Sequence, residues 1–303
     1  MALSKASHAG APRNPGPSWG YLFLYRAGTA LPAPVFSFLL GLGSWVAVAC
    51  MPKQRRHSRD YLTAILQRPA RLTEIWRHFF AFARALMLKL RVAEGQAHRW
   101  VDGPGCIPFA TLMEHGGSTL LGTFHLGDSD LLGFMVGQLD LRIYMIRLRV
   151  ENSRDTQRLA LRFGKSVTYL WVNEPENLLF SLKDAVQSGV SVAMQCDRPE
   201  YSAKLEPFEF LGQRRLFPFT IYHLALIFDR PVVFCVSVPH GGNESLIYSS
   251  TIFAPNGSSK GENLARARVH FQDFLARVES LLRQNPFLWF NFTPLNPPAS
   301  PDR

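Results

Sequence analysis

The sequence has few charged residues and few cysteines, and both scarcities narrow the possible classes of protein. Only 18% of the 303 residues are Asp, Glu, Lys or Arg, whereas 47% are hydrophobic, which is enough for a sizeable core. The four cysteines, Cys50, Cys106, Cys196 and Cys235, lie far apart, with no C-x-x-C pair and no histidine at ligand spacing. We therefore expect reduced thiols and neither disulfides nor a cysteine metal site.

The chain also lacks the short motifs of nucleotide-binding proteins and serine hydrolases. It contains no G-x-G-x-x-G and no G-x-x-x-x-G-K-[ST]. Residues 189–193 come near the G-x-S-x-G elbow of serine hydrolases, but they lie within a strand-like run, where Ser191 is an ordinary sheet residue. The nine histidines are scattered, which disfavours a nuclease or a metal hydrolase.

Positive charge is concentrated in the first third of the chain, around a long uncharged segment. Residues 1–100 contain 14 Lys and Arg but 3 Asp and Glu, a net charge of +11, whereas the remaining residues carry 19 and 20. Segment 31–51 has no charged residue, and a helix of that length, at ~1.5 Å per residue, spans the ~30 Å of a bilayer core. This placement favours a membrane surface over nucleic acid as the partner.

Four basic residues follow this segment directly: Lys53, Arg55, Arg56 and Arg59. By the positive-inside rule they keep the C-terminal part of the chain in the cytoplasm, so we predict a membrane anchor with the rest of the protein on the cytoplasmic side. The Pro and Gly residues of the segment leave a re-entrant or interfacial helix open. A buried core helix is a further alternative.

Composition divides the chain into four parts. Residues 1–18 are small, polar and rich in Pro and Gly and are predicted to be disordered, 19–58 hold the anchor and its basic flank, 59–295 form the main domain, and 296–303 are a disordered tail. Residues 59–92 repeat apolar side chains at helical spacing, with arginines among them. This pattern is typical either of a helix resting on lipid or of a packed helix with a solvated face.

From residue 118 onward, strand-like and helix-like runs alternate. The pattern predicts an α/β fold with a mostly parallel central sheet flanked by helices, preceded by the N-terminal membrane-anchoring helix. The strand-like runs are 119–124, 142–146, 167–172, 190–195, 232–238 and 246–253, and the helix-like runs are 129–139, 153–163, 175–188, 217–228 and 261–284.

The first candidate for chemistry is an H-x-x-x-x-D pattern formed by His125 and Asp130. It follows an apolar run and precedes another, which predicts a buried strand, a tight turn and the start of a helix. If both side chains reach one pocket, the carboxylate can accept the Nδ1–H of the imidazole and leave Nε2 free to act as a general base. The alternatives are a plain turn histidine and, for Asp128 or Asp130, a helix cap.

Two further groups of charged residues come after strand-like runs. Arg147 and Arg149 follow one run and can bind a phosphate group, although a solvated loop arginine is equally consistent with the pattern. Asp197 ends another run and can belong to a site or simply pair with Arg198. Because ligands of open α/β sheets lie beyond the carboxyl ends of the strands, we expect His125, Arg147 and Asp197 to share one edge.

A segment rich in Phe and Pro follows Asp197. Its aromatic side chains either line an apolar pocket for an acyl chain or, as is more common for buried aromatics, form part of the core. The side chains concerned are Phe208, Phe210, Phe217 and Phe219.

Together these features resemble the lipid A late-acyltransferase (lauroyl/myristoyl transferase) family, within the lysophospholipid acyltransferase superfamily. The resemblance spans roughly residues 20–292 and includes the apolar anchor, His125-x-x-x-x-Asp130, the Arg147 region, the strand ending in Asp197, segment 210–212 and a terminal Pro…Trp box at 284–290.

Two features depart from the pattern of that family. The acid of the histidine motif is usually Glu in the lipid A enzymes and is Asp130 here, as in the wider superfamily. The basic residues after the terminal Trp are replaced by Phe290, Asn291 and Phe292. Besides a phosphorylated glucosamine, the acceptor therefore remains open to an aminolipid, a glycolipid or a polyene lipid.

The resemblance implies an acyltransferase that moves a fatty acyl chain from an acyl carrier protein or coenzyme A thioester to a lipid hydroxyl or amine. In this scheme His125 is the general base, Asp130 orients it, and Arg147, Arg149 and Asp197 bind substrate. It also implies lipid A and lipopolysaccharide biosynthesis at the bacterial inner membrane, without a metal or redox cofactor. The competing hypotheses are an acyl-lipid binding protein without catalysis and a lipid hydrolase.

Overall fold

The computed structural model describes residues 26–28, 30–107, 111, 118–138, 141–147, 166–172, 175–199, 202 and 204–296. Four predictions fall wholly or mostly on residues outside this set. They are the disordered terminus 1–18, Arg149, the helix-like run 153–163 and all but the first residue of the tail 296–303.

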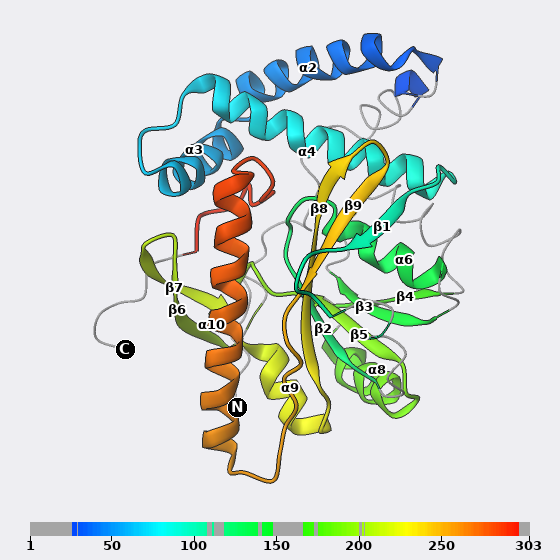
Figure 1. Ribbon diagram of the computed structural model, residues 1–303, viewed down its shortest axis with the longest axis vertical. Helices are drawn as coiled ribbons and strands as arrows, with labels where there is room; N and C mark the ends of the chain where they lie inside the picture. Colours follow the sequence, from blue (N-terminus) through cyan, green and yellow to red (C-terminus); the bar gives the residue numbers. More distant parts are fainter. Residues whose placement is uncertain are drawn as a thin grey trace.

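A mostly parallel sheet forms the centre of the described structure (Figure 1). Its seven strands lie in the order β1-β9-β8-β2-β5-β3-β4. Strands β2, β3, β4, β5 and β8 run in one direction, β9 pairs antiparallel with β8, and β1 pairs parallel with β9. The strands are β1 (Arg99–Asp102), β2 (Leu120–Thr123), β3 (Ile143–Arg147), β4 (Val167–Trp171), β5 (Ser191–Gln195), β8 (Val232–Gly241) and β9 (Glu244–Ser249).

Helices cover both faces of this sheet, because successive strand residues point to opposite sides and both sides are apolar. The short helix α6 (Leu132–Gln138) packs on the face that contains Leu121 and Val233. The other face packs against α8 (Pro175–Gln187), α9 (Thr220–Phe228) and the long helix α10 (Lys260–Gln284). This arrangement confirms the predicted α/β fold.

Most elements begin and end close to their predicted limits, but two predictions were wrong. The predicted helix 59–92 is two helices, α3 (Pro52–Leu66) and α4 (Leu72–Ala93). Between them Gln67 has a left-handed backbone, φ 55°, and Pro69 lacks the N–H that a continuous helix needs. The run 217–228 is helical only from Thr220 onward.

The Phe-rich segment after Asp197 forms a hairpin that the sequence pattern did not predict. Its strands are β6 (Leu205–Phe210) and β7 (Gln213–Pro218), and its turn places both Leu211 and Gly212 at positive φ. The hairpin packs beside α10, as Figure 1 shows. Strand β1 was also missed, since its four residues are too few to show a period.

The N-terminal helices form a separate layer above one end of the sheet (Figure 1). Among the described helices, α2 (Ala33–Cys50) alone is long and apolar enough to cross a membrane. Its outer side chains are open, with Phe38 72% and Val46 56% exposed. On its inner side, Trp45 stacks on Trp76 of α4 with ring centroids 5.6 Å apart.

Hydrogen bonds fasten this layer to the segment after α10. The hydroxyl of Tyr61 in α3 donates to the carbonyl of Pro286 at 2.9 Å, and Nε2 of His78 in α4 donates to the carbonyl of Trp289 at 2.8 Å. The other ring nitrogen of His78 accepts from Ser58 at 2.8 Å, which fixes the tautomer. The segment that carries Trp289 is thereby held between α4 and the sheet.

Candidate active site

His125 lies in a tight turn just beyond the carboxyl end of β2. The turn depends on Gly127, whose φ is 52° and where a Cβ would come 2.5 Å from the carbonyl oxygen of Ser237. The amide of Gly127 donates to the carbonyl of Leu288, and the amide of Phe290 donates to the carbonyl of His125, both at 2.7 Å. The histidine backbone is therefore fixed from both sides.

The imidazole of His125 is oriented by Asp197, which follows the neighbouring parallel strand β5. Nδ1 lies 2.8 Å from Oδ1 of Asp197, and the amide of His125 donates to Oδ2 at 3.0 Å. The Asp197 side chain is fully buried, whereas 18% of the His125 side chain is exposed. Among the described residues, none hydrogen-bonds to Nε2.

Trp289 completes the surroundings of this carboxylate, because its indole Nε1–H donates to Oδ2 of Asp197 at 2.9 Å. Burial alone would raise the pKa of Asp197, but the opposing effects of His125, Arg198 and Trp289 lower that pKa to about 2. Asp197 is therefore ionised near neutral pH and accepts the Nδ1–H of His125. The free Nε2 is then the basic nitrogen.

Asp130 does not make the contact that the sequence predicted for it. Its Oδ2 accepts from Lys89 of α4 at 2.9 Å and lies 3.5 Å from Arg147, and its Oδ1 accepts from Gln195 at 3.0 Å. Although burial alone would raise the pKa of Asp130, the positive charges of Lys89, Arg147 and His125 hold it well below its usual range. The prediction that Asp130 accepts the Nδ1–H of His125 was wrong.

The reason for this error is the register of the sheet. Thr123 of β2 pairs with Gln195 of β5, and the amide of Cys196 donates to the carbonyl of Thr123 at 2.8 Å. Asp197 is consequently placed beside His125 by strand pairing, while the 3₁₀ turn Ser129–Leu131 directs Asp130 toward Lys89 and Arg147. A local spacing motif carries no information on such a long-range partner.

The predicted common edge is observed. His125, Arg147 and Asp197 come from the carboxyl ends of β2, β3 and β5, which are neighbours in the sheet. Asp197 contacts His125, and Asp130 connects Arg147 to the same turn. Arg147 also lies over the Tyr169 ring, 5.7 Å from its centroid.

The four phenylalanines for which an acyl pocket and the core were the alternatives belong to the core. All are 4% exposed or less, and they pack against α10, for example through Phe271, which lies 4.8 Å from Phe208 by ring centroids. The pattern of buried aromatics was therefore that of an ordinary core. The residues are Phe208, Phe210, Phe217 and Phe219.

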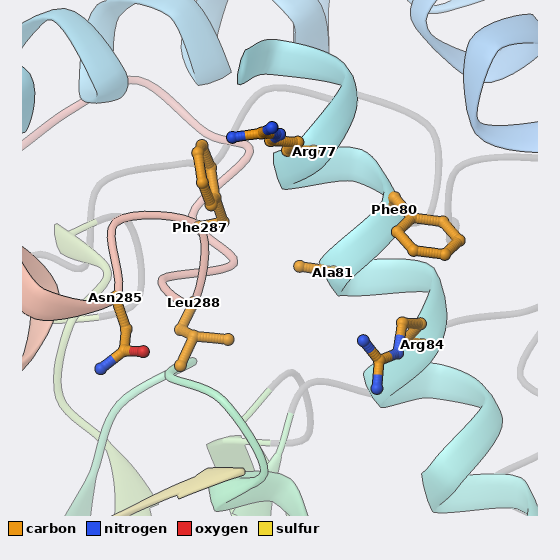
Figure 2. A pocket seen from close by; sticks show the side chains of 7 residues that line it. All are labelled: Arg77, Phe80, Ala81, Arg84, Asn285, Phe287 and Leu288. Carbon is orange, nitrogen blue, oxygen red and sulfur yellow. The ribbon is translucent and has the colours of Figure 1, made fainter. Parts of the chain in front are cut away.

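A pocket of about 250 Å³ opens instead between α4 and the segment that follows α10 (Figure 2). Leu288, which lines it, is the residue whose carbonyl holds Gly127 in the histidine turn. None of His125, Arg147 and Asp197 lines this pocket; His125 belongs to the adjoining turn. The lining residues are Arg77, Phe80, Ala81, Arg84, Asn285, Phe287 and Leu288.

Sequence reasoning missed three side chains that shape the site. Trp289 stood in the terminal Pro…Trp box, but nothing in the sequence connected it with Asp197. Lys89 lies in a helix 41 residues before Asp130, and Gln195 ends a strand 65 residues after it. Only the Gln195 position offered a signal, since it also ends a buried strand.

Asp128, the other acid of the turn, belongs to a buried polar network. Its Oδ2 accepts from Ser245 at 2.6 Å, and Ser245 lies 2.9 Å from Nε2 of His98. Burial raises the pKa of Asp128 to about 6, against the lowering effects of Ser245 and Arg84. The network ties β1 and β9 to the histidine turn.

The described residues contain no group of three or more His, Cys, Asp and Glu side chains that could hold a metal ion. All four cysteines are free thiols. Burial raises the pKa of Cys196 and of Cys235 well above the usual range, so both thiols are protonated and unreactive.

No family model matches the chain, and no curated protein matches it. The chain is similar to the crystal structure of the 1-acyl-sn-glycerophosphate (LPA) acyltransferase PlsC from Thermotoga maritima, with 13% identity and a TM-score of 0.41 over 82% of this chain and 97% of that chain. This degree of likeness does not assign a family or an activity.

Proposed function

We propose that the protein is a membrane-associated acyltransferase that moves a fatty acyl chain from a thioester to a lipid acceptor. The observation that carries this proposal is the His125–Asp197 pair, in which an ionised, buried carboxylate holds Nδ1 and leaves Nε2 as the basic nitrogen. This arrangement is suited to general-base chemistry on a hydroxyl or amine.

In the proposed reaction, Nε2 of His125 accepts the proton of the acceptor hydroxyl or amine as that group attacks the thioester carbonyl. Asp197 stabilises the imidazolium that forms. When the carbon–sulfur bond breaks, the imidazolium returns the proton to the leaving thiolate, so the acyl chain is transferred and a free thiol is released. No covalent acyl-enzyme is needed.

Asp130 has a different part in this proposal from the one its spacing predicted. It pairs with both Lys89 and Arg147 and accepts a hydrogen bond from Gln195, so it fixes the positions of two cations beside His125 and leaves one positive charge unbalanced. Arg147, 18% exposed, then remains available to a negatively charged part of a substrate.

The finer assignments follow from the resemblance of the sequence. We propose an acyl carrier protein or coenzyme A thioester as donor and a lipid or glycolipid as acceptor, as in late acylation of lipid A. The bacterial inner membrane is the proposed location, with the catalytic domain on the cytoplasmic side. The exposed apolar side of α2 and the basic residues after it support membrane attachment.

The test is incubation of the purified full chain with a radiolabelled acyl thioester, with and without lipid acceptors. A labelled lipid that forms only with acceptor present is expected, and it must disappear in His125→Ala. Free fatty acid without acceptor indicates a lipid hydrolase, and retention of unchanged label indicates an acyl-lipid binding protein. Either of these results overturns the proposal.

A further inference from the structure

The pocket between α4 and segment 285–288 carries two arginines that the proposed reaction does not use. Arg77 and Arg84 lie seven residues apart on α4, which is two helical turns, so both face the same side. Both are exposed, and neither forms an ion pair or a side-chain hydrogen bond with a described residue. The residues that line the pocket therefore include two positive charges and no carboxylate, and Asp128 of the adjoining turn is the acid on which the charge of Arg84 acts.

The walls between these charges are apolar. The Arg77 guanidinium lies 6.0 Å from the centroid of the Phe287 ring, and Leu288 faces Arg84 across the opening (Figure 2). An anion with an apolar body matches this combination, because a guanidinium binds phosphate oxygens in a fork while the aromatic wall contacts carbon.

A row of aromatic rings connects the pocket with the outer helix. Phe80, which lines the pocket, stacks on Trp76 at 5.3 Å between centroids, and Trp76 stacks on Trp45 of α2 at 5.6 Å. Trp45 is 38% exposed and belongs to the same helix as the open Phe38. Apolar surface thus continues from the proposed membrane helix to the mouth of the pocket.

The opposite side of the pocket reaches the histidine turn. The carbonyl of Leu288 accepts from the amide of Gly127, two residues after His125. The charge of Arg84 also acts on Asp128 in that turn. A ligand bound at the arginines would therefore lie next to the site of the proposed chemistry.

We propose that the Arg77–Arg84 pocket binds the phosphate of an anionic bilayer lipid. The two guanidinium groups hold the phosphate, and the acyl chains lie along Phe80 and the aromatic row toward α2. This site goes beyond acyl transfer, because the bound lipid is a headgroup contact that fixes the protein on the bilayer beside the histidine turn, whether or not it reacts.

The test uses the full chain in neutral detergent micelles, to which phosphatidic acid or phosphatidylcholine is added, with bound lipid counted by native mass spectrometry. Arg77→Gln with Arg84→Gln should weaken phosphatidic acid binding by about tenfold or more, since charge-assisted hydrogen bonds are lost. The matched control is Arg142→Gln with Arg214→Gln, which removes equal charge from exposed positions outside the N-terminal helices and the pocket and should change the affinity little.

Two further variants separate a pocket from diffuse attraction. Ala81→Leu fills the pocket without changing charge and should weaken phosphatidic acid binding as the arginine pair does. His125→Ala should retain the binding while losing acyl transfer, so failure of the proposed reaction and failure of this site give different results. Thermal unfolding of each variant confirms that it is folded.

Three outcomes overturn the proposal. Equal loss in the two arginine pairs indicates diffuse attraction, and unchanged binding in Ala81→Leu excludes the pocket. The third is a soluble ligand: if coenzyme A or inorganic phosphate binds with the same dependence on Arg77 and Arg84 and phosphatidic acid does not, the pocket serves a soluble phosphate compound.

Discussion

At the edge of the sheet near His125, charged side chains are paired and Asp197 is fully enclosed, whereas the outer side of α2 exposes apolar side chains. Asp197 has no exposed surface and accepts three hydrogen bonds. Phe38 of α2 is 72% exposed. Buried charged groups are costly unless each has hydrogen-bond or ionic partners. A large exposed apolar surface is costly in water unless a membrane or another protein covers it.

The two regions consequently depend on different surroundings. The polar groups at the His125 edge have their hydrogen-bond partners within the protein, so their geometry is expected to persist in detergent or buffer. The exposed apolar side chains of α2 are stabilised only in an apolar environment, which a bilayer supplies. They are joined through α4 and Trp289, whose carbonyl accepts from His78 and whose indole donates to Asp197. Because the hydrogen bonds at the His125 edge and the exposed apolar surface of α2 involve different side chains, substitutions in one region should leave the function of the other largely intact despite this connection.

The largest effect is expected at the histidine itself. His125→Ala should lower acyl transfer by ~10²–10⁴-fold, which is the usual contribution of a general base. The protein should remain folded and bound to membranes, since the side chain is partly exposed and its hydrogen bond is to Asp197 rather than to α2. Initial rates and vesicle flotation measure the two properties. Full activity in this variant would exclude the mechanism.

Replacing each carboxylate in turn by its amide tests which of the two orients the imidazole of His125. Asp197→Asn should lower the rate by ~10²-fold, because it removes the charge that orients and stabilises the imidazolium, and hydrogen bonds to charged groups contribute about 1.5–3 kcal/mol each. Asp130→Asn should lower it by about tenfold, since it disturbs Lys89 and Arg147 without releasing Nδ1. If Asp130→Asn lowers the rate more than Asp197→Asn does, then Asp130 rather than Asp197 orients His125.

Two substitutions on the outer face of α2 test whether this helix attaches the protein to a bilayer. Phe38→Glu with Val46→Glu should weaken bilayer attachment by about tenfold or more, because charged residues enter an apolar phase at a cost of ~2.5–3.5 kcal/mol at its centre. The matched control is Ile227→Glu with Val269→Glu, which replaces similarly exposed apolar residues on α9 and α10. Flotation with vesicles compares the pairs. Equal loss in both pairs would exclude a specific role of α2.

The smallest effect on transfer is expected at Asp128, which does not contact His125. Asp128→Asn should change the rate by less than about tenfold, well below the loss of a general base. The main effect of Asp128→Asn should be on how the free energy of unfolding depends on pH. The pKa of Asp128 is about 6 in the folded protein against 3.8 as reference, so the folded state binds more protons between these values.

The free energy of unfolding of the unsubstituted protein should therefore fall as the pH rises from about 4 to about 6, and this part of the slope should be missing in Asp128→Asn. Denaturant titrations of both proteins across this pH window measure the difference. A constant difference across the window would show that Asp128 is not shifted.

Local periodicity was sufficient for the strands of the central sheet except β1. The runs before His125, Arg147 and Asp197 appear as β2, β3 and β5, because alternation and burial leave a pattern in a few consecutive residues. The anchor segment 31–51 appears as α2 for the same reason. Prolines and left-handed residues are less visible in such patterns, and the break between α3 and α4 was missed.

The contact between residues at the ends of neighbouring strands could be determined only from the tertiary structure. His125 and Asp197 are 72 residues apart, and what brings them together is the register of β2 on β5 and the position of Trp289 beneath them. A spacing motif reports only neighbours along the chain, so it favoured Asp130. The sequence by itself therefore determined the histidine, the strand ends and the apolar helix, while the packing of distant segments decided which acid holds the histidine and which aromatics are core.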